Sequence, residues 1–376
     1  MLITGVRTVT CDIPLSKPIV MGELRFDSRE YCLVFVDTDQ GVTGLGVGMT
    51  RNAPVAAIVE RNLAPLLLGQ DPLMTEAMWD RLYYRNLTIA GRGIFMRALS
   101  AVDIALWDIK GQAAGLPIWQ LLGGARDRIP LAVAGGYVGE DKTKDDLARE
   151  VADYVGRGFS IVKISAGELD DDTERLRVSA EVVAGRAALA YDAHWAWRGL
   201  YEVVPTVRTW ASLGLAFIED PLAPELVARA PELRAATGIP LALGEDAVGR
   251  WAFQQLLTAC KPDIVRVDAT TVGGLSEAVK VCALASVESR PVIPHVFPEV
   301  HVHLAAAFPV VLAVEMTVSE YEIDLLFRLF KEWVTIESGV IHAPRRPGLG
   351  VSLDDAAVTR YQVASSSSTD TSAGVL

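Results

Sequence analysis

The first 48 residues carry hydrophobic and polar residues close to alternation. β-branched and aromatic residues dominate the apolar positions of 2–14 and 31–48, which is typical of half-buried strands. A turn near Asp39-Gln40-Gly41 predicts that the second of these segments is a hairpin. The polar stretch 15–29 lacks such alternation, and we expect it to be a loop.

From residue 53 to residue 120 the hydrophobic pattern changes to helical spacing. Its longest repeat runs over about 97–114, where apolar residues recur every three or four positions. Gly115 suits the position just after a helix, and Pro117 prevents the helix from continuing. The N-terminal third is therefore predicted to be an α+β unit without strand–helix–strand alternation.

After about residue 128, short apolar runs alternate with longer amphipathic stretches. The predicted strands cover residues 129–137, 160–164, 188–192, 215–219, 240–245, 263–268, 290–295 and 311–315. Eight strand–helix units over roughly 190 residues are typical of a (β/α)8 barrel, whereas a doubly wound open sheet has fewer strands. The α/β class with a TIM-like barrel is therefore favoured. The last segment, 363–376, is rich in Ser and Thr, and we expect a flexible tail.

The amino-acid composition and the net charge exclude several classes of protein. The chain has 376 residues with 35 Lys and Arg against 47 Asp and Glu, a net charge of −12. This balance disfavours nucleic-acid and anionic-membrane surfaces, which recruit basic residues. Hydrophobic residues make up 51% of the chain, which excludes disorder for most of it. The longest apolar run, 304–314, is too short to span a bilayer. Four cysteines without metal-site spacing, and no visible secretory signal, lead us to expect a cytoplasmic protein.

Chemically capable residues stand at the ends of seven of the predicted strands. They are Lys163, Asp192, Glu219, Glu245, Asp268, His295 and Glu315. Because active sites of such barrels are built at the carboxyl ends of the strands, these side chains are expected to meet at one mouth. A single acidic residue after a strand is usually a helix cap or a turn residue. Seven in register on successive units favour a functional site instead.

Three of these residues predict a metal centre. Asp192, Glu219 and Glu245 follow adjacent strands and would bring three carboxylates together, a ligand set that suits Mg²⁺. Three like charges in a low-dielectric mouth also need a cation to offset their repulsion. With Lys163, the metal would make a positive pocket for a carboxylate substrate. This combination points to removal of a proton α to a carboxylate.

Several blocks of sequence together resemble one family. The segment RALSAVDIALWDIKGQAAGLPIWQLLGG (97–124) looks like the signature helix of the mandelate racemase/muconate lactonizing enzymes of the enolase superfamily. VKIS, YDAH, FIEDPL, LALGED, DIVRVDATTVGG and IPHVFPEVHVHLAAA resemble its successive barrel blocks in order. The resemblance implies an N-terminal α+β capping domain (1–127), a modified barrel (128–319) and a C-terminal segment (320–362) that returns to the cap. It also implies a homo-oligomer.

The resemblance assigns roles to the strand-end residues. It implies that Asp192, Glu219 and Glu245 bind Mg²⁺ and that Glu315 hydrogen-bonds a substrate carboxylate oxygen. Asp268 and His295 match the Asp–His dyad of the mandelate-racemase subgroup, in which the carboxylate orients the imidazole as a general base. Lys163 matches the first Lys of the family's Lys-x-Lys motif, with an electrostatic role.

One position departs from the family pattern. Ser165 replaces the second Lys, usually the base on the opposite face, and a serine without an activating partner is a poor base. His194 stands two residues after Asp192, where the family's galactonate- and mannonate-type dehydratases place a general acid. Dehydration of an aldonic or aldaric acid sugar to a 2-keto-3-deoxy acid is therefore favoured. A racemase or epimerase using Lys163 as second base is the alternative, and a catalytically silent barrel that binds sugar acids is a third reading.

Other residues are candidates of lesser weight. Possible substrate contacts, besides Ser165, are Tyr137, Trp195, Arg25 and Arg51. His301 and His303 lie in EVHVHLAAA, and we expect them to cap or line a helix rather than to bind metal.

Overall fold

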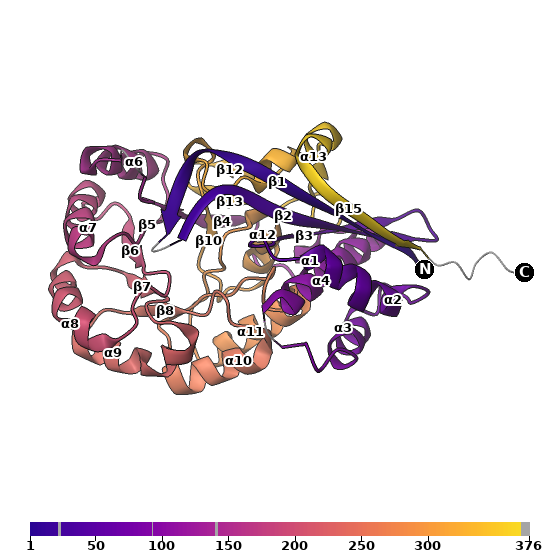
Figure 1. Cartoon of the computed structure of the whole chain (residues 1–376), viewed down its shortest axis with the longest axis horizontal. Helices are drawn as coiled ribbons and strands as arrows, with labels where there is room; N and C mark the ends of the chain where they lie inside the picture. The colour runs from indigo at the N-terminus through magenta and orange to yellow at the C-terminus, as the bar shows by residue number, and fades with distance from the viewer. Residues whose placement is uncertain (22–23, 92, 140–141, 370–376) are drawn as a thin grey trace, which may run out of the picture.

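The computed structural model describes residues 1–21, 24–91, 93–139 and 142–369, and these form a barrel with a cap beside it (Figure 1). The cap begins with a meander of three antiparallel strands, followed by helices. Its elements are β1 (Ile3–Met21), β2 (Leu24–Thr38), β3 (Thr43–Met49), α1 (Val55–Ile58), the π turn η1 (Val59–Leu63), α2 (Ala64–Leu67), α3 (Thr75–Tyr84), α4 (Gly93–Ala114) and α5 (Ile118–Leu121). The predicted turn at residues 39–41 and the long helix are thereby confirmed.

The second unit is a ring of parallel strands with helices outside it. In chain order it comprises β4 (Arg128–Gly135), α6 (Lys144–Gly156), β5 (Ile161–Ser165), α7 (Leu169–Val183), β6 (Ala188–Asp192), α8 (Leu200–Thr209), η2 (Trp210–Leu213), β7 (Phe217–Glu219), η3 (Pro224–Arg229), α9 (Ala230–Thr237), β8 (Leu241–Leu243), α10 (Gly249–Gln255), η4 (Leu256–Cys260), β9 (Ile264–Val265), α11 (Leu275–Val287), α12 (Pro298–Ala307) and β10 (Val314–Met316). The strands pair in sequence from β4 to β9, and β10 pairs with β4. The predicted α/β barrel is therefore confirmed.

The seventh predicted strand is an exception. Residues 290–295 form no regular strand; a single residue, Val292, bridges Val265 on one side and Val311 on the other. Pro291 and Pro294 flank it, and proline has no N–H to donate to a ladder. The ring is thus closed at this point by isolated bridges.

The C-terminal segment returns to both units. It contains η5 (Ser319–Tyr321), η6 (Leu326–Leu329), β11 (Phe330–Glu332), β12 (Thr335–Glu337), β13 (Val340–His342), β14 (Ser352–Leu353), α13 (Asp355–Tyr361) and β15 (Gln362–Thr369). β13 pairs antiparallel with β4 of the barrel, whereas β15 pairs antiparallel with β1 of the cap. The division of the chain at residues 127 and 319 stays a prediction.

Two expectations about irregular segments were wrong. Residues 15–21 end β1 and residues 24–29 begin β2, with Ile19 opposite Phe26, so these residues are strands and not a loop; residues 22 and 23 lie outside the described residues. Most side chains of these strand ends are at least partly exposed, so the alternation that marks a half-buried strand is missing. The tail expected over 363–376 forms β15 up to Thr369, because the open edge of β1 offers backbone partners. Residues 370–376 lie outside the described residues.

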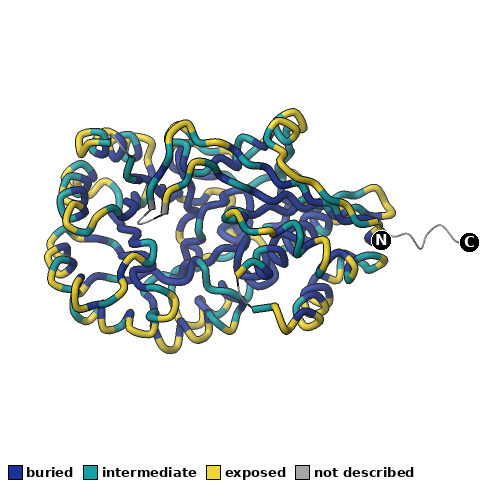
Figure 2. The backbone as a smooth tube through the Cα atoms, in the orientation of Figure 1, coloured by how far each residue is buried: buried dark blue, intermediate teal, exposed yellow. Residues whose placement is uncertain are grey.

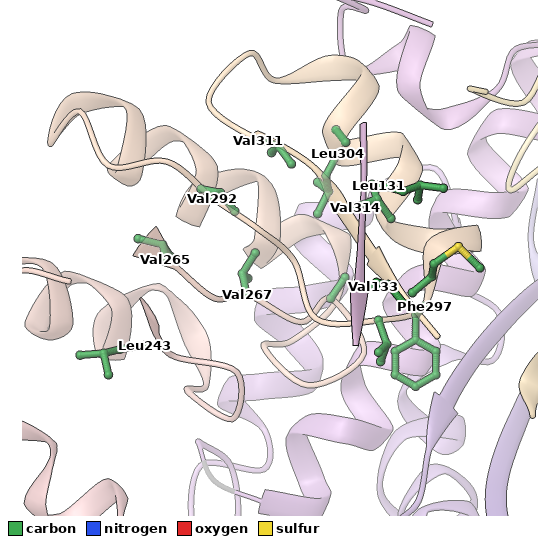
Figure 3. Close-up of a cluster of buried hydrophobic side chains, with 14 of the residues drawn as sticks. Leu131, Val133, Leu243, Val265, Val267, Val292, Phe297, Leu304, Val311 and Val314 are labelled. Carbon is green, nitrogen blue, oxygen red and sulfur yellow. The ribbon is translucent and has the colours of Figure 1, made fainter. Parts of the chain in front are cut away.

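Branched aliphatic side chains fill the region between the barrel strands and α12. Figure 2 shows the buried backbone concentrated inside the ring and along α4 and α12. In the close-up, Val265, Val267 and Val292 lie beside one another, and Leu131 and Val314 pair across β4 and β10 (Figure 3). All four cysteines are buried with free thiols, as expected of cysteines that serve as small hydrophobic residues. Among the described helices, none is long and apolar enough to cross a membrane.

Glycines in β3 allow the cap sheet to approach α4 closely. A Cβ added to Gly46 would lie 1.8 Å from the Ala101 carbonyl oxygen, and one added to Gly44 would lie 2.1 Å from that of Ala105. Both obstacles are backbone atoms inside a 22-residue helix, which cannot move aside cheaply. The glycine-rich segment therefore serves packing between the sheet and α4.

This packing predicts different outcomes for two neighbouring glycines. Gly46→Ala should lower the free energy of unfolding by about 3 kcal/mol or more, at the upper end of overpacking effects, because helix and strand must separate. Gly48→Ala is the matched control, since its Cβ would meet no atom closer than 3.6 Å, from Thr270. Soluble yield and urea unfolding followed by tryptophan fluorescence report both. Equal stability of the two variants would contradict this account.

Candidate active site

Three carboxylates meet at the carboxyl ends of adjacent strands. Asp192 ends β6, Glu219 ends β7 and pairs with Asp192 in register, and Glu245 follows β8 by two residues. Their oxygens lie within 4.8 Å of one another, and all three residues are buried. The sequence prediction that they converge agrees with this geometry.

Two buried cations pair with Asp192, Glu219 and a further carboxylate, Glu315. The Lys163 Nζ on β5 lies 2.8 Å from Asp192, 3.0 Å from Glu219 and 2.9 Å from Glu315. Arg266, which follows β9, is fully buried and pairs with Glu219 at 3.0 Å and with Glu315 at 2.7 Å. Burial opposes the charge on Lys163, but these three carboxylates raise its pKa well above the ordinary value.

The three carboxylates are a suitable site for a hard divalent cation. Burial, together with the charges of Asp192 and Glu219, raises the pKa of Glu245 well above its ordinary value. Burial also raises the pKa of Glu219, although Arg266 and Lys163 act in the opposite direction. The Glu219 Oε2 atom is buried without a hydrogen-bond partner. Like charges and an unpartnered oxygen of this kind are what a bound cation would compensate.

The expected dyad is formed on the far side of the ring. The Asp268 Oδ2 atom lies 3.0 Å from the His295 Nδ1, and the backbone N–H of Thr270 donates to Asp268 Oδ1 at 2.7 Å. Burial works against an ionised Asp268, but hydrogen bonding and charge from His295 hold its pKa at about 2. An ionised Asp268 on Nδ1 leaves the other ring nitrogen of His295, Nε2, available toward the cavity.

The structure also supplies a partner for Ser165, which the sequence did not show. The Ser165 Oγ atom lies 3.0 Å from His194 Nε2, and His194 Nδ1 lies 3.3 Å from Asp192 Oδ1. His194 has a φ of 47°, a conformation that few non-glycine residues adopt. Burial lowers the pKa of His194 to about 4, more than the charge of Asp192 raises it.

The two histidines face one small cavity. It has a volume of about 30 Å³, and its lining includes Lys163, His194, His295 and Glu315. His194 follows the third position of the ring and His295 the seventh, which lie opposite each other in an eight-membered barrel. The cavity is therefore reached by an imidazole from each side.

The predicted substrate contacts divide between this cavity and other places. Tyr137 and Arg51 line the cavity, and the Arg51 Nη2 lies 3.3 Å from Glu245 Oε1. Trp195 instead lines a separate cavity of about 650 Å³ toward α10. Arg25 is exposed and pairs with Asp27 at 3.3 Å, outside the lining. The roles of Trp195 and Arg25 as substrate contacts stay predictions.

Comparison with known proteins gives the family. Residues 3–123 match the N-terminal domain of mandelate racemase/muconate lactonizing enzymes, and residues 146–357 match the enolase C-terminal domain-like family. The chain belongs to the mandelate racemase/muconate lactonizing enzyme family. This finding confirms the resemblance drawn from the sequence blocks, and with it the enolase-superfamily architecture of a cap and a barrel.

Its similar relatives include enzymes of acid-sugar chemistry. Arabinonate dehydratase of Saccharolobus solfataricus is 33% identical over 87% of this chain and 89% of its own. D-galactarolactone cycloisomerase of Agrobacterium fabrum is 32% identical over 96% of this chain and 99% of its own. The crystal structure of L-talarate/galactarate dehydratase from Salmonella typhimurium, liganded with Mg and L-lyxarohydroxamate, is 26% identical, covers 98% of this chain and 94% of its own, and has a TM-score of 0.88.

Sequence reasoning missed several residues of the site. Thr317, at the end of the barrel, and Ile323 and Asp324, from the C-terminal segment, line the cavity without belonging to any motif. Arg266 did leave a signal: it stands two residues before Asp268 in a predicted buried strand, so both side chains point the same way. A charged residue at such a position is expected to meet opposite charges.

The ion pairs of Arg266 predict a large effect on stability. Arg266→Gln should lower the free energy of unfolding by about 3–5 kcal/mol, because Glu219 and Glu315 lose a buried partner. The control is Arg234→Gln, whose pair with Asp263 is about one-third exposed and is expected to contribute about 0–1 kcal/mol. Urea unfolding of both variants, with a chelator present, gives the two free energies of unfolding to compare. Similar small losses in both variants would show that Arg266 does not stabilise the carboxylates.

Proposed function

We propose that this protein is a Mg²⁺-dependent hydro-lyase that dehydrates an aldonic or aldaric acid sugar to a 2-keto-3-deoxy acid. The observation that carries the proposal is the pair of histidines on opposite sides of one buried cavity, each with its own partner. A reaction that removes a proton at one carbon and a hydroxyl at the next needs a base and an acid at two positions. Acid-sugar dehydratases among the relatives support the same reaction class.

His295 is the proposed base. Asp268 accepts a hydrogen bond from Nδ1, so Nε2 carries the lone pair that removes the proton α to the substrate carboxylate. The electron pair of the broken C–H bond moves into the enediolate. Asp268 then stabilises the imidazolium that has formed.

His194 is the proposed acid. It donates a proton to the departing 3-hydroxyl, the C–O bond breaks, and water leaves. Ser165 holds the His194 ring through Nε2 in the structure without substrate. A carboxylate substrate adds negative charge beside His194, which raises the pKa of an imidazole. The enol that results tautomerises to the 2-keto acid.

The charged residues of the mouth would stabilise the developing negative charge. Asp192, Glu219 and Glu245 would hold Mg²⁺, which supplies positive charge beside the substrate carboxylate. Lys163 adds a second positive charge from β5. Glu315 pairs with two cations, which outweigh the effect of burial and lower its pKa. Glu315 faces Lys163 and Arg266 at 2.9 Å and 2.7 Å, and its predicted hydrogen bond to a substrate carboxylate oxygen stays a prediction.

Tyr137 and Arg51, with Arg29, are the proposed contacts to the rest of the substrate, because they line the cavity beyond the reacting groups. A homo-oligomer and a cytoplasmic location stay predictions.

The racemase alternative required Lys163 as a second base. Three ion pairs engage the Lys163 ammonium and stabilise its charged form, which disfavours that role.

A substrate panel tests the reaction. The purified protein with Mg²⁺ should convert at least one of a set of aldonic and aldaric acids, including D-galactonate and galactarate, to a product that reacts with a 2-keto-acid reagent. His295→Asn should lower exchange of the α-proton with D₂O by about 100-fold or more. His342→Asn, on β13 and outside the cavity, is the control. Exchange at the original rate in His295→Asn would refute the base assignment, and epimers in place of keto acids would favour the racemase.

Metal binding is tested without substrate. Millimolar Mg²⁺ should raise the thermal midpoint, since a ligand at about 100 times its Kd stabilises the native state by about 2.7 kcal/mol. Glu219→Gln should abolish most of this shift, whereas Glu232→Gln on exposed α9 should retain it. Calorimetric titration gives the affinity directly. Absence of binding to the original protein would favour the silent barrel.

A further inference from the structure

A second buried histidine lies directly behind the dyad. His301 is on α12, is fully buried and lies outside the lining of the cavity. Its Nε2 accepts a hydrogen bond from the backbone N–H of Ala269 at 2.8 Å, and its Nδ1 lies 2.6 Å from the Val296 carbonyl oxygen. Ala269 follows Asp268, and Val296 follows His295. One imidazole therefore joins the two loops that carry the dyad.

These two contacts fix the protonation of His301. Nε2 faces an N–H donor and must be unprotonated, while Nδ1 faces a carbonyl and must carry the proton. Burial lowers the pKa of His301, so the neutral ring is favoured. The Asp268 Oδ1 atom is 3.6 Å from Nε2, which is too far for a hydrogen bond. His301 thus binds backbone and leaves the carboxylate of Asp268 to His295.

The loop held by His301 is strained. Val296 has a φ of 37° and Phe297 a φ of 46°, in a region that β-branched and bulky residues rarely adopt. Both peptide groups of Val296 are engaged, since its N–H donates to Glu315 Oε1 at 3.3 Å and its carbonyl accepts from His301. The turn that directs His295 into the cavity persists because these contacts hold it.

We propose that His301 is a positioning residue that sets the distance and angle between Asp268 and His295 by joining their loops. The effect of His301 on the reaction rate rests on the proposed function of His295 as the base. Its effect on the position of the His295 ring does not. Loss of the link would let the Val296 turn relax and would move the His295 ring away from Asp268. Misplacement of a catalytic group by about 1 Å can lower a rate about 100-fold.

The chain offers a matched control on the same helix. His303 is also fully buried, and its Nδ1 accepts from the Trp119 N–H at 3.2 Å while its Nε2 lies 3.1 Å from the Leu349 carbonyl oxygen. These contacts join α12 to the cap and to the C-terminal segment, not to the dyad. His301→Phe and His303→Phe each remove two buried hydrogen bonds and keep a ring, so they separate positioning from stability.

Two further variants remove one bond at a time and guard against a failure of His301→Phe to fold. His301→Asn can still donate to Val296 from the position of Nδ1, and His301→Gln can still accept from Ala269 at the position of Nε2. Each is expected to retain part of the activity that His301→Phe loses.

The first measurement needs no substrate. The chain has five histidines, so ¹⁵N-histidine labelling gives few ring signals. In the Mg²⁺-treated protein, His301 should be the Nδ1–H tautomer and His303 the Nε2–H tautomer. The Nδ1 proton of His295, held by Asp268, should exchange faster in His301→Phe than in His303→Phe. A His295 signal that is the same in all His301 variants and the original protein would overturn the proposal.

The second measurement is kinetic, with D-galactonate and galactarate as the probes. His301→Phe should lower kcat for α-proton exchange about 10- to 100-fold with KM changed less than about threefold, whereas His303→Phe should keep kcat. Full kcat in His301→Phe, or an equal loss in both variants, would overturn the positioning role. If the original protein exchanges neither probe nor any other acid of the panel, the proposed function fails, and the His295 ring signal alone decides the role of His301.

Discussion

Four buried carboxylates at one end of the barrel constrain the whole site. Asp192, Glu219, Glu245 and Glu315 are four acidic groups, and three cations face them: the buried Lys163 and Arg266, and Arg51 beside Glu245. Repulsion between charges this close is large away from water, so the remaining excess needs a divalent cation or proton uptake. Parallel strands supply the geometry, because neighbouring strands in register place successive carboxylates side by side. The barrel is therefore a frame that holds like charges together at a site suited to a cation.

The cap completes the mouth that the barrel frames. The long β1–β2 hairpin reaches over the ring in Figure 1, and a bridge between Val20 and Val138 joins it to the loop after β4. Arg29 and Arg51 enter the cavity lining from this side. The cavity of about 30 Å³ has room for about one water molecule. An acid sugar is larger than this, and Tyr137 and Ile323 also line an adjoining cavity of about 740 Å³.

The sequence predicts the functional residues that recur at the strand end of successive barrel units. Strand-end residues such as Asp192 and His295 could be found because each barrel unit places one at a regular interval. Residues such as Ile323 and Asp324 could not be found, since their place in the site depends on how the C-terminal segment crosses the mouth. The same limit applies to β15: its serines carry no hydrophobic pattern, and only the free edge of β1 makes them a strand. His301 looked like a helix residue and is one, but its two partners come from loops far apart in sequence.

Ser165 stands where the family pattern that the sequence blocks resemble has a second lysine. With a lysine there, two bases would face one carbon from opposite sides, and a proton could be removed on one face and returned on the other. Here one face has His295 with an ionised partner, and the other has His194 held by a serine hydroxyl. The two rings differ in their partners, since His295 Nδ1 meets Asp268, whereas His194 meets both Ser165 and Asp192. Such asymmetry favours a reaction in which a proton leaves from one side and a hydroxyl is protonated on the other.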